Sequence, residues 1–254
     1  MTRRRFFASP FDINLSARTI ILSTEETRHL RDVLRLKVGE EIFVFDGNGK
    51  EYSCRINAAS RDSALVEIQN EVTPASPESD LNLDLAIALL KGDKFDLVIQ
   101  KATELGVTKF IPVVTRNADV KFRNAVDLNN RVGRWQRIAL EASKQSGRAL
   151  VPSVTPPVDI NSVLSGLYET DGKRLRLMFS ERDGGSLENA LETSAATRDV
   201  TILIGSEGGW RDEEIAKGRA ENWQIITLGG RILRAETAAV AVTALIQHIC
   251  GDLR

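Results

Sequence analysis

The sequence is poor in the residues that mark disulfide-rich or membrane proteins. Its two cysteines, Cys54 and Cys250, lack the paired spacing of a disulfide framework or a zinc site. The longest apolar run, Ala238 to Ile246, contains Thr243 and is far shorter than the roughly 20 residues that a spanning helix needs. No apolar stretch follows the basic start Arg3-Arg4-Arg5, so we expect no secretory signal. These absences predict a reduced cytoplasmic protein without a membrane segment or a bound metal.

A strong excess of either charge is also missing. The net charge is −1, which argues against a surface coated in positive charge for nucleic acid. Two segments are nevertheless basic, because residues 1–37 and residues 131–148 each hold four more cationic than anionic side chains. Charge alone does not distinguish a binding patch from an ordinary solvated face. Any contact with RNA phosphates would have to come from these two segments.

A change of pattern near residue 73 predicts two domains. Residues 73–80 carry two prolines and small polar side chains without apolar periodicity, as linkers do. Before them, β-rich runs at 41–45, 51–56 and 64–68 predict a small β-barrel over residues 1–72, interrupted by a helix from about Glu25 to Leu36. After them, over residues 81–254, apolar strands alternate with amphipathic helices, which is typical of an α/β domain with a mostly parallel sheet. We expect its strands at residues 83–90, 109–114, 175–179, 201–205 and 224–228.

One predicted helix of the second domain places its basic side chains along one face. Over residues 128–145, Trp135, Ile138 and Ala142 fall on one side at about 100° per residue. Arg134 and Arg137 fall on the opposite side. A basic stripe facing solvent favours contact with RNA phosphates.

Two glycine-rich loops leave predicted strands. Ile204-Gly205-Ser206-Glu207-Gly208-Gly209 ends one buried strand, at the edge where an open α/β sheet binds its ligand. A tight turn into the next helix is the alternative interpretation. Neither G-x-G-x-x-G nor G-x-x-x-x-G-K-[ST] occurs, which disfavours NAD and ATP.

The second loop, residues 228–238, places charged side chains before an apolar helix. Arg234 and Glu236 would be costly there unless they are paired or bound to something polar. An Arg234–Glu236 pair that only supports the loop therefore remains an alternative to a binding role.

Motifs along nearly the whole chain resemble the SPOUT superfamily, and within it the ribosomal RNA uridine N3-methyltransferases known as RsmE. The resemblance rests on Arg-Arg-Phe-Phe at the start, His29-x-x-x-Val-Leu-Arg35, Lys91-Gly92-Asp93-Lys94, residues 101–106, residues 141–148 and the two glycine loops. One departure is Ser206, where the family usually has proline; the loop loses a φ restraint but no side-chain chemistry.

The resemblance implies a fold, a cofactor and partners. It implies an N-terminal PUA-like barrel for RNA, a C-terminal domain with a trefoil knot, and a homodimer acting on small-subunit (16S) ribosomal RNA, within an assembled subunit. A knot would not be expected from general topology. S-adenosylmethionine is the implied cofactor, with contacts on Phe179, Ser180, Ile204, Gly205, Ser206, Glu207, Gly208, Gly209, Leu228, Gly229, Ile232, Leu233, Arg234, Glu236, Thr237 and Ala238.

The expected reaction needs a proton removed from uridine N3. Glu236 or Glu207 could accept it through a water, or Arg234 could stabilise the anion formed on the neighbouring oxygens. His29 could act as a base, but it lies in the barrel domain, where RNA contact or packing is the alternative. The residues expected to contact RNA are Arg3, Arg4, Arg5, His29, Arg35, Arg131, Arg134, Arg137 and Arg148.

Three other functions remain open. A related enzyme could methylate another base or the ribose. An RNA-binding protein could keep the fold without catalysis, although Glu207, Arg234 and Glu236 weigh against this. A nucleotide-dependent oxidoreductase is less consistent with the missing phosphate fingerprints.

Overall fold

The computed structural model describes residues 3–117, 122–167, 174–192 and 197–253. The chain divides into two compact units. The N-terminal unit comprises residues 1–78 and 140–151, and the C-terminal unit comprises residues 79–139 and 152–254. One division falls inside the expected linker, but the return of residues 140–151 to the N-terminal unit was not predicted.

The N-terminal unit is built on a six-stranded sheet with the order β1-β4-β5-β6-β3-β2. Strand β1 runs parallel to β4, and the other neighbours are antiparallel. Side chains such as Phe6, Ile42 and Val66 are fully buried and form one apolar core. The strands are β1 (Arg5–Phe7), β2 (Ile13–Asn14), β3 (Thr19–Leu22), β4 (Glu41–Phe45), β5 (Glu51–Ala59) and β6 (Ala64–Val72), with the short 3-10 turn η1 (Pro10–Asp12) before β2.

The expected helix from Glu25 to Leu36 is shorter and irregular. The α-helix α1 (Thr24–Arg28) begins after Ser23, whose hydroxyl accepts a hydrogen bond from the Glu26 N–H. It continues as one π-helical segment, η2 (His29–Val33), and ends before Arg35, whose φ is +54°. Sequence periodicity does not predict this change of helix type, because π-turns are rare and depend on tertiary packing.

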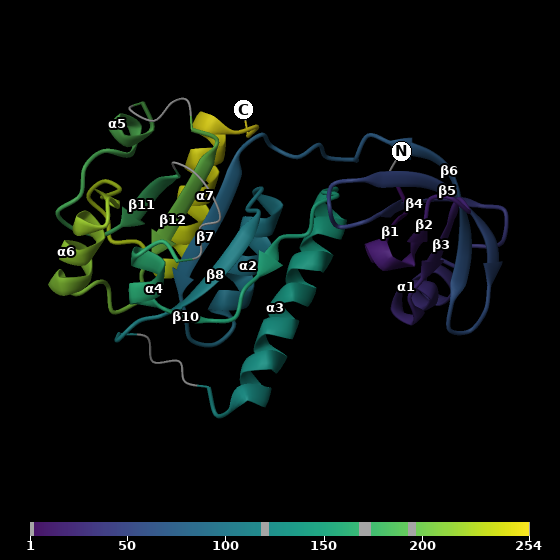
Figure 1. Ribbon diagram of the computed structural model, residues 1–254, viewed down its shortest axis with the longest axis horizontal. Helices are drawn as coiled ribbons and strands as arrows, with labels where there is room; N and C mark the ends of the chain where they lie inside the picture. The colour runs from purple at the N-terminus through teal and green to yellow at the C-terminus, as the bar shows by residue number, and fades with distance from the viewer. Residues whose placement is uncertain (1–2, 118–121, 168–173, 193–196, 254) are drawn as a thin grey trace. The chain divides into compact units, whose positions relative to one another are not determined.

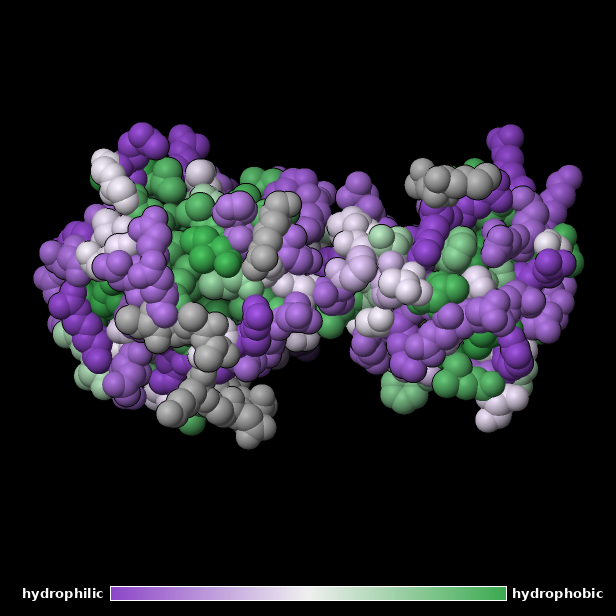
Figure 2. Space-filling view, turned by 90° about the horizontal axis from the view of Figure 1, so that it is seen from above, coloured by the Kyte–Doolittle hydropathy of each residue, from purple (hydrophilic) through white to green (hydrophobic). Residues whose placement is uncertain are grey.

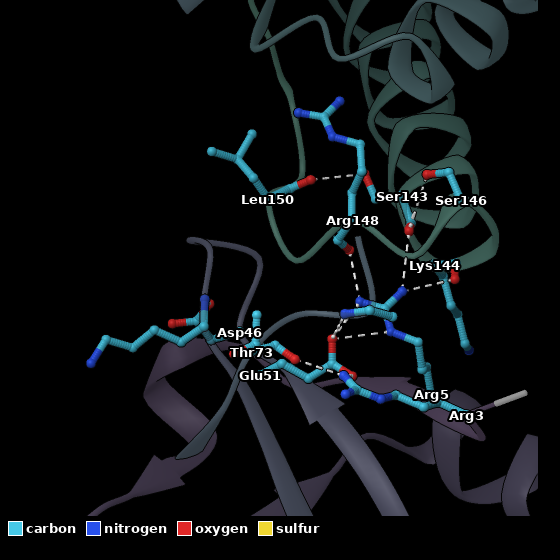
Figure 3. Close-up of polar contacts among 12 residues, drawn as sticks. Arg3, Arg5, Asp46, Glu51, Thr73, Ser143, Lys144, Ser146, Arg148 and Leu150 are labelled. Atoms are coloured by element: carbon cyan, nitrogen blue, oxygen red, sulfur yellow. Dashed lines mark hydrogen bonds and ion pairs between the residues drawn. The ribbon is translucent and has the colours of Figure 1, made fainter. Parts of the chain in front are cut away.

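A buried ionic network joins the first strand to residues 143–148 (Figure 3). The Arg5 guanidinium lies 3.0 Å from the fully buried Glu51 carboxylate and donates to the carbonyls of Ser143, Lys144 and Arg148. It therefore satisfies two carbonyls in the last turn of a helix, where a cation is favoured.

Arg148 is buried as well, and its guanidinium lies 2.7 Å from the Glu78 carboxylate. Both Arg5 and Arg148 were expected on an RNA surface. The structure instead places them in the interior of the N-terminal unit, since a buried guanidinium requires anionic or carbonyl partners.

The C-terminal unit contains a parallel sheet with the order β10-β8-β7-β12-β11-β13, and β9 also pairs with β8 (Figure 1). Every pair in it is parallel, which confirms the predicted α/β class with a mostly parallel sheet. Its central strands are buried on both faces, as apolar runs predict. The strands are β7 (Asn82–Ala88), β8 (Lys109–Val114), β9 (Ser153–Val154), β10 (Val158–Asp159), β11 (Leu175–Phe179), β12 (Asp199–Ile204) and β13 (Gln224–Ile226).

Helices cover both faces of this sheet (Figure 1). Helices α4 and α6 share an apolar cluster with one face, whereas α7 packs on β12 and on α2. Helix α3 packs through Trp135, whose ring centroid lies 4.5 Å from that of Phe95 on α2. Within the described ranges, no helix has both the length and the apolar character needed to cross a membrane. The helices are α2 (Lys94–Glu104), α3 (Ala125–Ser146), α4 (Ile160–Leu164), α5 (Leu187–Glu192), α6 (Asp212–Ala220) and α7 (Ala235–Cys250).

Candidate cofactor and catalytic site

Three loops meet at one edge of the parallel sheet. They follow β12, β11 and β13, which are adjacent in the order β12-β11-β13. Because the carboxyl ends of parallel strands lie at the same edge, the loops come together although they are far apart in sequence. Both glycine loops and the third expected loop, Phe179-Ser180-Glu181, belong to this group.

The loops enclose a cavity of about 540 Å³, within the range of small-molecule sites. Helix α7 closes one side through Ala235, Ala238 and Val242. The residues around the cavity are Phe179, Ser180, Glu181, Ile204, Gly205, Ser206, Glu207, Gly208, Gly209, Trp210, Thr227, Leu228, Gly229, Gly230, Arg231, Ile232, Leu233, Arg234, Ala235, Ala238 and Val242.

Close contacts explain why the first glycine loop, residues 205–209, has glycine at two of its positions. Gly209 has φ of +64°, and a Cβ atom there would lie 3.0 Å from the Glu181 carboxylate. A Cβ atom on Gly205 would lie 3.1 Å from the Trp210 ring, whose indole N–H donates to the Phe179 carbonyl at 2.7 Å. Glycine at these positions lets two neighbouring loops approach each other closely. The contribution of Trp210 was not predicted, because its partner is distant in sequence.

Asn117 holds the same loop from outside the cavity. Its side-chain amide donates to the carbonyls of Gly208 and Gly209, each at 3.2 Å. Its carbonyl oxygen accepts from the Arg211 guanidinium at 3.3 Å. These bonds give the two loop carbonyls a hydrogen-bond partner within the protein.

Most of the expected cofactor residues surround this one cavity. The exceptions are Glu236 and Thr237, which lie in the first turn of α7 but are not among the residues around the cavity. The Ser206 side chain is buried, and its hydroxyl oxygen has no hydrogen-bond partner in the described structure. An unpaired buried hydroxyl is costly, which fits a site that supplies polar groups to a ligand.

Arg234 and Glu236 do not pair with each other. Arg234 is the exposed N-cap residue of α7 and has no ion pair with any described residue. A Glu236 carboxylate oxygen instead lies 3.9 Å from the Lys94 ammonium. The alternative in which Arg234 only supports the loop through Glu236 is therefore not what the structure contains.

Lys94 also contacts the first glycine loop. Its ammonium donates to the Glu207 carboxylate at 2.7 Å. Burial alone would raise the pKa of Glu207, but the hydrogen bonds from Lys94 and from its own backbone N–H, together with the charges of Lys94 and Lys91, hold that pKa below its ordinary value. Lys94 was noted only as part of the motif at 91–94, and its position beside both glutamates required the fold.

The residues expected to bind RNA differ in their exposure and in whether they form ion pairs. On α3, Arg131 pairs with Asp127 and Arg134 with Asp96, whereas Arg137 is exposed with no ion pair to a described residue.

In the N-terminal unit, the Arg3 and Arg4 guanidiniums lie near Glu51 and Glu40, respectively. Arg35 is exposed and has no ion pair within the part of the chain that the structure describes. The His29 ring lies edge-on to Phe6, and burial together with the nearby charge of Lys144 lowers the pKa of His29.

The comparisons with known proteins agree over nearly the whole chain. The family model for an RNA methyltransferase domain matches residues 77–247, and the model for an RNA methyltransferase PUA domain matches residues 22–69. The Ribosomal RNA small subunit methyltransferase E of Synechocystis sp. is 34% identical over 91% of this chain and 73% of its own length.

Two solved structures are also similar over their full length. One is the Ribosomal RNA small subunit methyltransferase E from Neisseria gonorrhoeae bound to S-adenosyl methionine, with 33% identity, TM-score 0.87 and complete coverage of both chains. The other is a methyltransferase from Legionella pneumophila in complex with the same cofactor, with 28% identity, TM-score 0.86 and complete coverage of both chains. The chain described here therefore belongs to the RNA methyltransferase family, among the ribosomal RNA small subunit methyltransferases E, with a PUA domain before its methyltransferase domain.

Proposed function

We propose that this protein transfers a methyl group from S-adenosylmethionine to N3 of a uridine in small-subunit (16S) ribosomal RNA. The observation that carries the proposal is the cavity formed by the loops after β11, β12 and β13, in a chain whose relative from Neisseria gonorrhoeae binds this cofactor. The uridine and its N3 position are implied by the family resemblance. The cytoplasm and an assembled small subunit are the setting in which we expect the reaction.

The residues around the cavity fit the cofactor. Leu228, Ile232 and Leu233 offer apolar walls for an adenine ring, and the glycine loop offers backbone N–H groups. The buried, unpaired hydroxyl of Ser206 adds a polar group for the rest of the molecule. When bound, S-adenosylmethionine supplies a methyl group on a positively charged sulfur.

Arg234 is our candidate for stabilising charge on the uridine. Loss of the N3 proton leaves negative charge on the neighbouring carbonyl oxygens, which a preorganised guanidinium can stabilise. Arg234 lies at the cavity, is exposed and has no ion pair with a described residue to compete for it. Glu207, which borders the cavity, and Glu236, in the first turn of α7, are the candidates for accepting the proton through a water.

We assign RNA contact to the cations that the structure leaves accessible. Arg137 and Arg35 have no ion pair with a described residue, and the pairs of Arg4, Arg131 and Arg134 are at least partly exposed. Arg3 is partly exposed, although its partner Glu51 is buried. Exposed pairs such as those of Arg4, Arg131 and Arg134 contribute roughly 0–1 kcal/mol, so a phosphate can replace their partners at little cost. Arg3 would instead have to contact RNA while it keeps its bond to the buried Glu51. His29, with a lowered pKa, would contact RNA as a neutral group. Arg5 and Arg148 are not part of this proposal, because they are buried.

Cofactor binding tests the proposal before any RNA is added. Isothermal titration calorimetry is expected to give one S-adenosylmethionine site per chain and no binding of NADH or ATP, since both phosphate-binding fingerprints are missing. Tight binding of NADH or ATP without binding of S-adenosylmethionine would refute the proposal.

We also propose a homodimer that uses α7. On this apolar helix Val242 and Ile246 are fully buried within the chain, whereas Leu245 and Ile249 are 41% and 42% exposed. Figure 2 shows hydrophobic residues at the surface of the C-terminal unit. A self-complementary contact through a two-fold axis would remove such side chains from water.

Light scattering tests the dimer. The wild-type protein is expected at twice the chain mass of 28.0 kDa, and the double variant Leu245→Glu/Ile249→Glu at that mass itself. The control Val126→Glu, at an exposed position on α3, should stay dimeric. A wild-type monomer with full activity at micromolar concentration would contradict the dimer.

A further inference from the structure

Lys94 carries its positive charge at the N-terminus of a helix, where positive charge is unfavourable. It is the first residue of α2, an 11-residue helix, and the first turn of a helix carries unpaired N–H groups and partial positive charge. A lysine at this position is disfavoured unless anions lie beside it. The structure supplies two, Glu207 and Glu236, from two other elements.

These two glutamates come from two different elements at the cofactor cavity. Glu207 belongs to the glycine loop after β12, and Glu236 lies in the first turn of α7, between Ala235 and Ala238, which both border the cavity. Lys94 is not among the residues around the cavity. Its ammonium therefore joins the glycine loop to the first turn of α7 without bordering the cavity, with a hydrogen bond of 2.7 Å to Glu207 and a distance of 3.9 Å to Glu236.

The glycine loop depends on such contacts for its shape. Glycines at 205, 208 and 209 leave its backbone many conformations, and no proline restrains φ between Gly205 and Gly209. Asn117 fixes the loop through two carbonyls, and Lys94 is the cation that fixes it through the Glu207 side chain.

Lys94 is hydrogen-bonded to Glu207 but not to Glu236. The Lys94 ammonium lies beside two carboxylates, and the Glu236 oxygen nearest to it is buried and has no hydrogen-bond partner in the described structure. The distance of 3.9 Å is too long for a hydrogen bond. Lys94 thus holds Glu207 directly and Glu236 only through charge.

We propose that Lys94 is a positioning residue that fixes the glycine loop for S-adenosylmethionine by holding Glu207 against the start of α7. This inference rests on the proposed function, since it concerns the same cavity. Lys94, the last residue of the motif at 91–94, would act through the Glu207 side chain and not by contact with the ligand.

A double-mutant cycle in cofactor affinity tests the proposal. By calorimetry, Lys94→Met should weaken S-adenosylmethionine binding about fivefold in the wild-type background, the upper end of what a partly exposed ion pair contributes. In a Glu207→Gln background the same change should have an effect of less than about twofold, because the partner through which Lys94 acts is already altered. Lys94→Arg should restore affinity to within about threefold of wild type.

A matched control lies on the same helix. Lys101 pairs with Glu104 at 2.9 Å on α2, so Lys101→Met removes an equivalent helix charge and should leave affinity unchanged. An undiminished effect of Lys94→Met in the Glu207→Gln background, or no effect in the wild-type background, would overturn the proposal. Failure of the unmutated protein to bind S-adenosylmethionine would instead refute the proposed function, so the two failures are distinct.

Discussion

Arg234→Ala is expected to slow single-turnover methylation by roughly 10²-fold or more, the usual loss when one preorganised donor to a developing anion is removed. Arg234 is exposed at the cofactor cavity and has no ion pair with a described residue, so its charge is available to the uridine. Both substrates must be saturating, because the side chain lies in a cofactor loop and its loss could also weaken binding. Rapid-quench measurement of methyl transfer to small subunits would give the rate.

The control separates this effect from a general loss of positive charge. Arg61→Ala removes an exposed cation from the N-terminal unit and should leave the single-turnover rate unchanged. If Arg234→Ala reacts at nearly the wild-type rate at saturation, Arg234 has no part in the chemistry.

Arg5→Ala is expected to lower the free energy of unfolding of the N-terminal unit by about 3–5 kcal/mol, as does removal of one partner from other buried ion pairs. Among the described residues, the change leaves the fully buried Glu51 with Arg3 as its one cationic partner and removes the donor to three carbonyls. Since a domain is stable by only about 5–15 kcal/mol, a loss of this size is severe.

Two spectroscopic signals make the measurement specific. All three tryptophans, Trp135, Trp210 and Trp223, belong to the C-terminal unit, so their fluorescence in urea follows that unit, whereas circular dichroism follows both. We expect the larger shift in circular dichroism. The neighbouring exposed pair, Arg4 with Glu40, provides the control, and Arg4→Ala should cost no more than about 1 kcal/mol. Equal, small effects of the two substitutions would show that the buried network does not stabilise the unit.

Local patterns predicted the features that local chemistry determines. The apolar runs at 109–114 and 175–179 are strands β8 and β11 with those bounds, and the apolar side of α3 packs through Trp135 as its periodicity predicts. The glycine loops came together because parallel strands end at one edge of the sheet.

Features set by distant contacts were not predictable in the same way. Nothing local indicates that Arg5 meets Glu51 and the carbonyls near residue 143, so a basic start was interpreted as an RNA surface when part of it is interior. Lys94 was missed as a site residue for the same reason, because Glu207 and Glu236 lie more than a hundred residues away. The trefoil knot remains a prediction from the family resemblance, since it is a property of the whole chain path.

The most direct test of the proposed activity is nucleoside mass spectrometry of small-subunit RNA that lacks its natural modification at the target. Small subunits would be incubated with the protein and S-adenosylmethionine, and their RNA digested to nucleosides. The proposed function predicts 3-methyluridine in the small-subunit RNA only when both the protein and the cofactor are present. Methylation of another base or of a ribose, or no methylation by a protein that binds the cofactor, would contradict it.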